Sequence, residues 1–263
     1  MKKTFLILTA VLILVLFAPI LSAATVTWGS STTISGDTDV ANFGTLSYAY
    51  YFANVYNPPA ADAEVVNGVS FQKVTMANPY SVVSPFSIGG GNLTASGSSG
   101  IVSMADSNSN SSPYASLSAS YQNILGGQLY DNNNCTLSLT LNNLTSGQSY
   151  MVQFWCNESR AIYGVETRTG RITAGGQYVD ITYNTTQTEG GVGQWVAATF
   201  TADASSETFA FTGVSGDQNI PMLNAVQVRS VPEPSVCVLL GLAFLFVIIR
   251  QRNALIGKVK EGK

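Results

Sequence analysis

Hydrophobic and polar residues alternate along most of the chain in short runs, as they do in strands that bury one face. The runs are rich in β-branched and aromatic residues, and Gly, Asn, Ser and Pro separate them. They occupy residues 26–28, 46–52, 69–74, 135–141, 150–155, 178–183, 195–201, 208–212 and 223–228. Many short strands joined by polar loops predict an all-β fold, a single antiparallel β-sandwich or jelly roll, rather than a parallel sheet.

One segment has a helical pattern instead. Apolar residues recur at helical spacing at Tyr114, Leu117, Tyr121, Ile124 and Leu125, and Gly126-Gly127 would end a helix there. We therefore expect a short helix near 114–125. Because strand signals lie on both sides of it, residues 25–230 are expected to form one domain.

A turn between two predicted strands carries a fold signal. The segment from Leu144 to Tyr150 has the spacing Leu-x-x-Gly-x-x-Tyr and precedes an alternating strand. It resembles the tyrosine corner of sandwich domains, in which the phenol caps backbone across the bend. The alternative is a hairpin, which would make the two strands direct neighbours.

The first residues predict a secretory signal peptide, residues 1–24. Two lysines precede a stretch, 5–18, that contains no charged residue, and the small residues Ser22, Ala23 and Ala24 follow. This arrangement is typical of a segment that signal peptidase removes, so we expect cleavage after Ala24. The alternative is an uncleaved N-terminal anchor. Residues 25–230 are expected outside the cytoplasm.

The last residues predict a transmembrane helix. Residues 235–249 contain no charged residue, and Arg250 and Arg252 begin a basic end, 250–263. As a helix the segment would be about 22 Å long, which is short for a hydrocarbon core of about 30 Å, although snorkelling arginines and local thinning could close the gap. The positive-inside rule keeps 250–263 in the cytoplasm and leaves the body outside.

The whole tail, residues 231–263, resembles a known sorting signal. Val231-Pro232-Glu233-Pro234-Ser235, an apolar helix and an arginine cluster follow one another as in the PEP-CTERM signal of Gram-negative bacteria. The resemblance implies that Pro232, Glu233 and Pro234 are the motif recognised by exosortase, a membrane-embedded Cys-dependent enzyme. The chain continues through 253–263, where such tails usually stop, and a plain C-terminal anchor is the alternative.

The resemblance also sets an expected location and partners. It implies a body held in the periplasm by a helix in the inner membrane, then released to the cell surface or extracellular matrix, with a link to exopolysaccharide and biofilm. Residues 35–40, 66–71 and 200–203 resemble a recurrent type of PEP-CTERM passenger, which implies a galactose-binding-like or other lectin-like jelly roll. No particular ligand is implied.

Composition excludes some functions. Residues 25–230 hold thirteen Asp and Glu against five Lys and Arg, a net charge of −8. An acidic body with no basic stripe excludes nucleic acid as a partner, because phosphate contacts supply most of that affinity. The chain has no histidine, the usual general base and the commonest metal ligand. A carboxylate pair could still hydrolyse a glycoside. Glu158 and Glu166 are the best candidates for such a pair, and Asp180 is a further candidate.

Two cysteines of the body, Cys135 and Cys156, could form a disulfide. Both fall on the core side of their strands by the period of two, and the turn before Tyr150 lies midway between them. An oxidising periplasm would permit the bond. Two buried free thiols are the alternative.

One aromatic residue is a candidate for sugar binding. Trp155 falls on the face opposite Phe154, so we expect it to be exposed beside Asn157, Glu158 and Arg160. An exposed ring for stacking with a few fixed polar groups is what a sugar site uses. The alternative places Trp155 under a loop or a second layer.

Two acids could supply oxygens to a structural Ca²⁺, the one cofactor considered. Asp37 and Asp39 flank Thr38 in a Gly-preceded loop, without the spacing of an EF-hand. Solvated turn carboxylates are the alternative.

Two functional classes remain open, and neither needs a catalytic residue. The first is a non-catalytic cell-envelope or matrix protein packed among exopolysaccharide. The second is a carbohydrate-binding module with a defined sugar site, and a glycoside hydrolase or lyase comes third. A cluster of exposed aromatic residues around one loop end would favour the second class.

Overall fold

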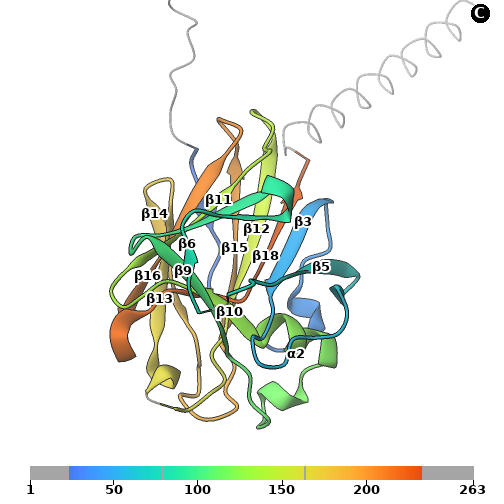
Figure 1. Cartoon of the computed structure of the whole chain (residues 1–263). Coiled ribbons are helices and arrows are strands. Elements are labelled where there is room, and N and C mark those ends of the chain that lie inside the picture. Colours follow the sequence, from blue (N-terminus) through green and yellow to red (C-terminus); the bar gives the residue numbers. More distant parts are fainter. Residues whose placement is uncertain (1–23, 79, 163, 233–263) are drawn as a thin grey trace, which may run out of the picture.

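The computed structural model describes residues 24–232 except 79 and 163, and these form three β-sheets with short helices between them (Figure 1). The expected signal peptide before Ala24, the motif residues Glu233 and Pro234, the helix 235–249 and Arg250 and Arg252 lie outside the described residues. Within 24–232, no helix is both long and apolar enough to cross a membrane.

The largest sheet has eight strands. Its order is β1–β15–β12–β18–β3–β5–β4, with β2 also paired to β15. The strands are β1 (Thr27–Trp28), β2 (Thr32–Thr33), β3 (Thr45–Phe52), β4 (Ala63–Val66), β5 (Val69–Val74), β12 (Ser149–Cys156), β15 (Gln194–Thr201) and β18 (Ala225–Ser230). The antiparallel prediction fails at one pair, because a hairpin closed at Asn67-Gly68 places β5 parallel to β3.

Two smaller sheets complete the fold. The six-stranded sheet has the order β14–β13–β16–β11–β8–β7, and the four-stranded sheet has the order β17–β10–β9–β6. The six strands are β7 (Phe86–Ile88), β8 (Leu93–Gly97), β11 (Thr136–Leu141), β13 (Thr169–Ala174), β14 (Gln177–Thr182) and β16 (Glu207–Ser215). The four are β6 (Val82–Val83), β9 (Ile101–Asp106), β10 (Gly127–Tyr130) and β17 (Met222–Leu223).

The predicted helix is present but divided. A 3-10 turn, η3 (Tyr114–Ser116), is followed by α2 (Ala119–Leu125). Ser118 separates them, since its hydroxyl caps α2 by accepting from the Tyr121 N–H at 3.2 Å. The other short helices are η1 (Asp37–Asp39), η2 (Gly89–Gly91), η4 (Val165–Thr167) and η5 (Asp217–Asn219).

The main core lies between the eight-stranded and six-stranded sheets, as in a sandwich. Phe154 of β12 packs on Phe209 and Phe211 of β16, with ring centroids 5.0 and 5.3 Å apart. The alternate leucines of β11 are fully buried in the same core. Alternation in the sequence therefore predicted this face correctly.

A second core covers the outer face of the eight-stranded sheet. Trp155 packs edge-to-face on Phe71, with ring centroids 5.5 Å apart, and its indole N–H donates to the Tyr121 hydroxyl of α2 at 3.0 Å. The expected exposure of Trp155 was therefore wrong. The period of two correctly turned this ring away from the main core, but α2 forms a second layer over it.

The turn before β12 is a tyrosine corner. The Tyr150 hydroxyl accepts from the Thr145 N–H at 2.9 Å, and Gly147 has a φ of 82°. Because β11 and β12 belong to different sheets, the corner and not the hairpin is correct.

The two cysteines of the body are free thiols, so the disulfide is not present. The corner places their strands in opposite sheets. Cys156 is fully buried in the main core, where its thiol donates to the Met222 carbonyl at 3.2 Å. Cys135 is only partly buried and lies in the turn before β11, where its N–H donates to the Asn132 carbonyl. The predicted strand included Cys135, but β11 begins one residue later, at Thr136, so the period of two does not apply to Cys135.

Candidate functional site

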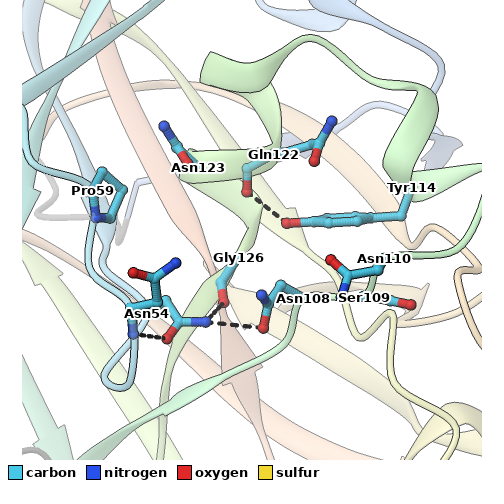
Figure 2. Close-up of a pocket in the computed structure, with 10 residues that line it drawn as sticks. Asn54, Pro59, Asn108, Ser109, Asn110, Tyr114, Gln122, Asn123 and Gly126 are labelled. Atoms are coloured by element: carbon cyan, nitrogen blue, oxygen red, sulfur yellow. Dashed lines mark hydrogen bonds between the residues drawn. The ribbon is translucent and has the colours of Figure 1, made fainter.

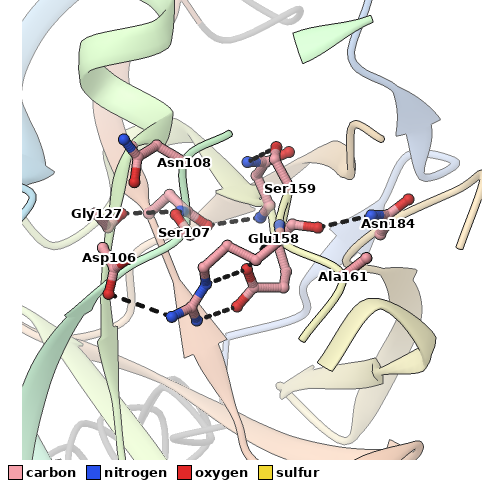
Figure 3. Close-up of polar contacts among 12 residues, drawn as sticks. Asp106, Ser107, Asn108, Gly127, Glu158, Ser159, Ala161 and Asn184 are labelled. Atoms are coloured by element: carbon pink, nitrogen blue, oxygen red, sulfur yellow. Dashed lines mark hydrogen bonds and ion pairs between the residues drawn. The ribbon is translucent and has the colours of Figure 1, made fainter. Parts of the chain in front are cut away.

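Polar residues gather at the end of β12 that lies away from Val231. Val231 donates its N–H to the Ser149 carbonyl at the start of β12, at 3.0 Å. After Cys156, at the other end of that strand, the chain continues through the segment 157–160. There Ser159 donates its N–H to the carbonyl of Ser107, in the loop that follows β9 (Figure 3), and Ser107 in turn donates its N–H to the Gly126 carbonyl after α2.

A buried acid and an arginine fix this segment. The Glu158 carboxylate accepts from Arg160 Nε at 2.7 Å and from Arg160 Nη2 at 2.6 Å, while Nη1 donates to Asp106 at 3.2 Å. Burial raises the pKa of the fully buried Glu158, and the bonds from Arg160 oppose that rise. The structure therefore brings Glu158 and Arg160 together, as a pair that joins β12 to β9.

Buried asparagines hold the neighbouring backbone. Asn224 Nδ2 donates to the carbonyls of Leu125 and Gly127 at 2.9 and 2.8 Å, and Asn157 accepts from the Gly193 N–H at 2.9 Å. These side chains satisfy backbone groups at the end of α2, at the start of β10 and just before β15. Asn157, fully buried, is thus part of the scaffold and not of an open surface.

A cavity lined mainly by amide groups lies next to this scaffold (Figure 2). Its volume is about 180 Å³. The lining residues are Asn54, Asn57, Pro59, Asn108, Ser109, Asn110, Tyr114, Gln122, Asn123 and Gly126. None of them carries a charge, so the cavity presents neutral donors and acceptors. We call it the amide pocket.

Asn54 organises one wall of the amide pocket. Its Nδ2 donates to Asn108 Oδ1 at 2.9 Å and to the Gly126 carbonyl at 3.2 Å, as Figure 2 shows. Its Oδ1 accepts from the N–H groups of Tyr56 and Asn57 at 2.8 and 2.9 Å. This Asx turn uses all of the Asn54 amide to shape the loop.

Several other amides of the pocket keep hydrogen-bonding capacity. The side chains of Asn57 and Asn110 are exposed and make no hydrogen bond to another described residue. Gln122 Nε2 donates to the Leu117 carbonyl at 2.7 Å, and Asn123 Nδ2 donates to Glu64 at 2.8 Å, which fixes both amides and leaves their oxygens available. The pocket thus combines fixed and adaptable polar groups.

An exposed pair of tyrosines is joined to the pocket through Tyr56, which directly precedes Asn57 and donates its N–H to Asn54. Tyr56 is 69% exposed and Tyr80 is 56% exposed, and their ring centroids are 6.4 Å apart. Hydrogen bonding with Tyr56 raises the pKa of the Tyr80 phenol, and Asp106 adds to the rise. The pKa of Arg160 is raised overall, because the effects of Glu158, Asp106 and Tyr56 together exceed the opposing effect of burial. The tyrosine pair therefore lies close enough to Asp106 and Arg160 for their charges to interact with the phenols.

The sequence did not single out the tyrosine pair or the amide pocket. The available signal was the segment 54–59, in which an aromatic residue stands between asparagines and prolines directly after a strand. Such a ring has no place in a strand and is expected on the surface. Nearby, Asp106 ends β9 and Ser107 is fully buried.

The candidate Ca²⁺ ligands have protein partners instead. Asp39 accepts from the N–H and hydroxyl of Ser35 at 2.6 and 2.8 Å and from the Tyr121 hydroxyl at 3.2 Å. Asp37 accepts from the Ser118 hydroxyl at 2.6 Å. Both acids therefore join η1 to α2. No group of three or more Cys, Asp or Glu residues in the described part of the chain could hold a metal ion.

No protein-family model matches the chain, and no curated protein is significantly similar to it. Among solved structures, the ANXUR1 extracellular domain from Arabidopsis thaliana is 10% identical with a TM-score of 0.45, over 72% of this chain and 49% of that one. The chain spans about half the length of that domain.

Two further structures are similar at a coarse level. One is from carbohydrate-binding modules of the β-sandwich superfamily, 10% identical with a TM-score of 0.26, over 81% of this chain and 100% of that one. The other is the exo-β-1,3-galactanase of Phanerochaete chrysosporium, 18% identical with a TM-score of 0.30, over 65% and 34%. These scores are low, so the fold described above rests on its own strand pairings.

Proposed function

We propose that residues 25–230 form a non-catalytic carbohydrate-binding domain of an exported envelope protein. The observation that carries this proposal is the amide pocket beside the exposed Tyr56–Tyr80 pair. The cluster of exposed aromatic residues around one loop end is the feature expected of a defined sugar site.

The chemistry of the site suits an uncharged, hydroxyl-rich ligand. Amide groups offer a donor and an acceptor side by side, which matches neighbouring hydroxyl groups of a sugar. The exposed tyrosine rings offer flat apolar surfaces on which the C–H face of a sugar can stack. Since the lining of the pocket has no charge, a charged ligand would gain nothing there to offset its desolvation.

The arrangement of acids supports binding rather than hydrolysis. Both oxygens of Glu158 bond to Arg160, so this carboxylate is not available as a nucleophile or an acid. Asp180 pairs with Arg171 at 2.7 Å across β13 and β14, in the six-stranded sheet. Glycoside hydrolysis needs two carboxyl groups on either side of one bond.

Export and sorting belong to the same proposal and rest on the sequence. Signal peptidase would remove residues 1–24, and exosortase would process the PEP-CTERM-like tail near Pro232, Glu233 and Pro234. The helix 235–249 would hold the protein in the inner membrane before processing. Exopolysaccharide of the cell surface or matrix would then be the source of the bound sugar.

The test is glycan binding by the body with and without the tyrosine ring. Loss of one stacking ring removes about 1.5 kcal/mol, so Tyr56→Ala should weaken binding of the strongest hit on a glycan array roughly tenfold. Tyr178→Ala is the matched control, because Tyr178 is also exposed but lies on β14, the outer strand of the six-stranded sheet. A body that binds no glycan on the array, or a Tyr56→Ala protein that binds like the control, would refute the proposal.

A further inference from the structure

A second cavity is lined by Arg160 and by Ala105, the residue before Asp106. Its volume is about 170 Å³. Its polar lining comes from Gln128, Tyr130, Arg160 and Arg168, and its apolar lining from Val165 and Ile220 among others. Gln128 and Tyr130 belong to β10, and Arg160 is the residue paired with Glu158.

Gln128 in this cavity is a buried amide without a partner. It is only 2% exposed, its Oε1 is completely buried, and its side chain makes no hydrogen bond to another described residue. An unpaired buried amide destabilises a fold, whereas an apolar side chain of similar shape at the same place would not. An amide that destabilises the fold in this way is expected at a position that serves binding rather than stability.

The two cavities adjoin along two paired strands. Gly126 lines the amide pocket and Gln128, two residues further on, lines the second cavity. On the neighbouring strand β9, Ala105 pairs with Gln128 and lines the second cavity, and Asn108 after its end lines the amide pocket. Two residues of chain span at most about 7 Å, so Gly126 and Gln128 bring the walls of the two cavities close together.

The charges around the second cavity balance. Two of the five cations of the body line it, but Glu158 and Asp106 both bond to Arg160. Arg168 lies close enough to Glu158 to lower the pKa of that carboxyl, against the larger effect of burial. The cavity therefore offers hydrogen-bond donors and one unpaired amide without a net positive field, which favours a hydroxylated ligand over an anionic one.

We propose that the amide pocket and the second cavity are adjacent subsites for a neutral oligosaccharide. One sugar unit would occupy the amide pocket beside the tyrosine pair, and the next would bond to Gln128 across the Asp106–Arg160 contact. This deepens and rests on the proposed function. It means that affinity rises from a monosaccharide to longer chains and that Gln128 carries part of the rise.

The test uses an array on which neutral and uronate-containing sugars appear as monosaccharides and as longer chains of the same units. Gln128→Met keeps the length of the side chain and removes both hydrogen-bonding groups. This variant should bind the longer neutral chains roughly tenfold more weakly, because it loses a buried hydrogen bond to the sugar. Its binding of the monosaccharide should be unchanged. Gln177→Met is the matched control, since Gln177 is exposed on β14.

Thermal unfolding separates a binding role from a structural one. Because Gln128 has no partner to lose, the Met variant should unfold at the same temperature as the unsubstituted body or a higher one. Should that variant fold poorly, Tyr130→Phe removes a hydroxyl from the same cavity and should weaken longer chains selectively. Equal binding of long and short neutral chains, stronger binding of uronate chains, or unchanged affinity in these variants would overturn the two-subsite proposal while leaving the amide pocket intact. Absence of all glycan binding would overturn the proposed function itself.

Discussion

Glu158 and Arg160 illustrate how a single pair of residues holds the candidate site in place. Desolvation of two charges is costly, and here it is offset by a bidentate contact and by the third bond to Asp106. Since Glu158 follows β12 and Asp106 ends β9, the contact fixes the end of β9, which carries Ala105 of the second cavity and leads to Asn108 of the amide pocket. A buried pair of this kind specifies geometry more than it adds stability.

Arg160→Met should leave Glu158 buried without its cation, which costs about 3–5 kcal/mol of unfolding free energy. The loss should depend on pH. With the Arg160 guanidinium gone, burial raises the pKa of Glu158 in the folded protein further, since only the backbone N–H of residue 160 and the charge of Arg168 still oppose the rise. A raised folded-state pKa means that stability is full below the ordinary carboxyl pKa and is lost as the pH rises through the folded-state value.

Urea unfolding of the variant at several pH values measures this effect. Arg171→Met is the control, because Arg171 forms an exposed pair with Asp180 and should change stability by only about 0–1 kcal/mol. The double variant Glu158→Gln and Arg160→Met should recover most of the loss and its pH dependence. Equal destabilisation by the two arginine variants would show that the buried pair has no special role.

For single residues, the sequence predicted correctly which face of a strand a side chain lies on. It did not predict whether another element covers that face. Alternation placed Phe154 in the main core and Trp155 on the opposite face, and both positions are correct. Whether that opposite face meets water depends on α2, more than 30 residues away in the chain. The unpaired state of Gln128 cannot be read from the sequence either, because it depends on neighbours from β9, from η4 and from the residue after η5.

Among the elements, the tyrosine corner is the one that the sequence specified most completely. Leu144, Gly147 and Tyr150 each have a physical role, since the leucine and the tyrosine ring are buried and the glycine takes a positive φ. The strands that were missed, such as β8 and β10, are short and contain Gly, Ser or Thr. Their hydrophobic signal is too weak for periodicity to detect. The helix was expected as one piece because apolar spacing continues through Leu117, whereas the Ser118 cap starts α2 afresh.

Tyr150→Phe should test the corner. The change keeps the buried ring and removes the hydroxyl, leaving the Thr145 N–H without its acceptor. Unfolding free energy should fall by about 1 kcal/mol, the usual contribution of such a bond. Chemical denaturation measures it, with Tyr178→Phe on the surface as the matched control. If the two variants are equally stable, the hydroxyl has no part in holding the bend.

In the whole molecule, the site and Val231 lie at opposite ends of β12. Val231 is fixed to the sheet by its bond to Ser149 and by Gln148 Nε2, which donates to the Val231 carbonyl at 3.0 Å. Pro232 is exposed. The expected sorting motif therefore begins at the surface of the body, about the length of an eight-residue strand away from the amide pocket. Sorting and sugar binding should be separable for this reason.

Glu233→Ala should leave export intact and cause an unprocessed, membrane-bound form to accumulate in a host with exosortase. The reasoning is that an enzyme in the bilayer must recognise Pro232, Glu233 and Pro234 next to the helix 235–249. Immunoblotting of membrane and released fractions measures this, with Tyr56→Ala as the control that should be processed normally. Identical sizes and fractions for the two variants would reduce the tail to an ordinary anchor.

The groove of about 290 Å³ shared by Thr25, Thr27, Val231 and Pro232 shows that the two ends of the body are neighbours. A chain whose ends meet is nearly a closed circle, and such domains tolerate circular permutation and insertion into other proteins. A short bridge from 231 to 25 would join the ends without disturbing β1 or β18. Inserted through that edge into a loop of a host protein, the body would present the amide pocket and the tyrosine pair outward, at the end remote from the graft.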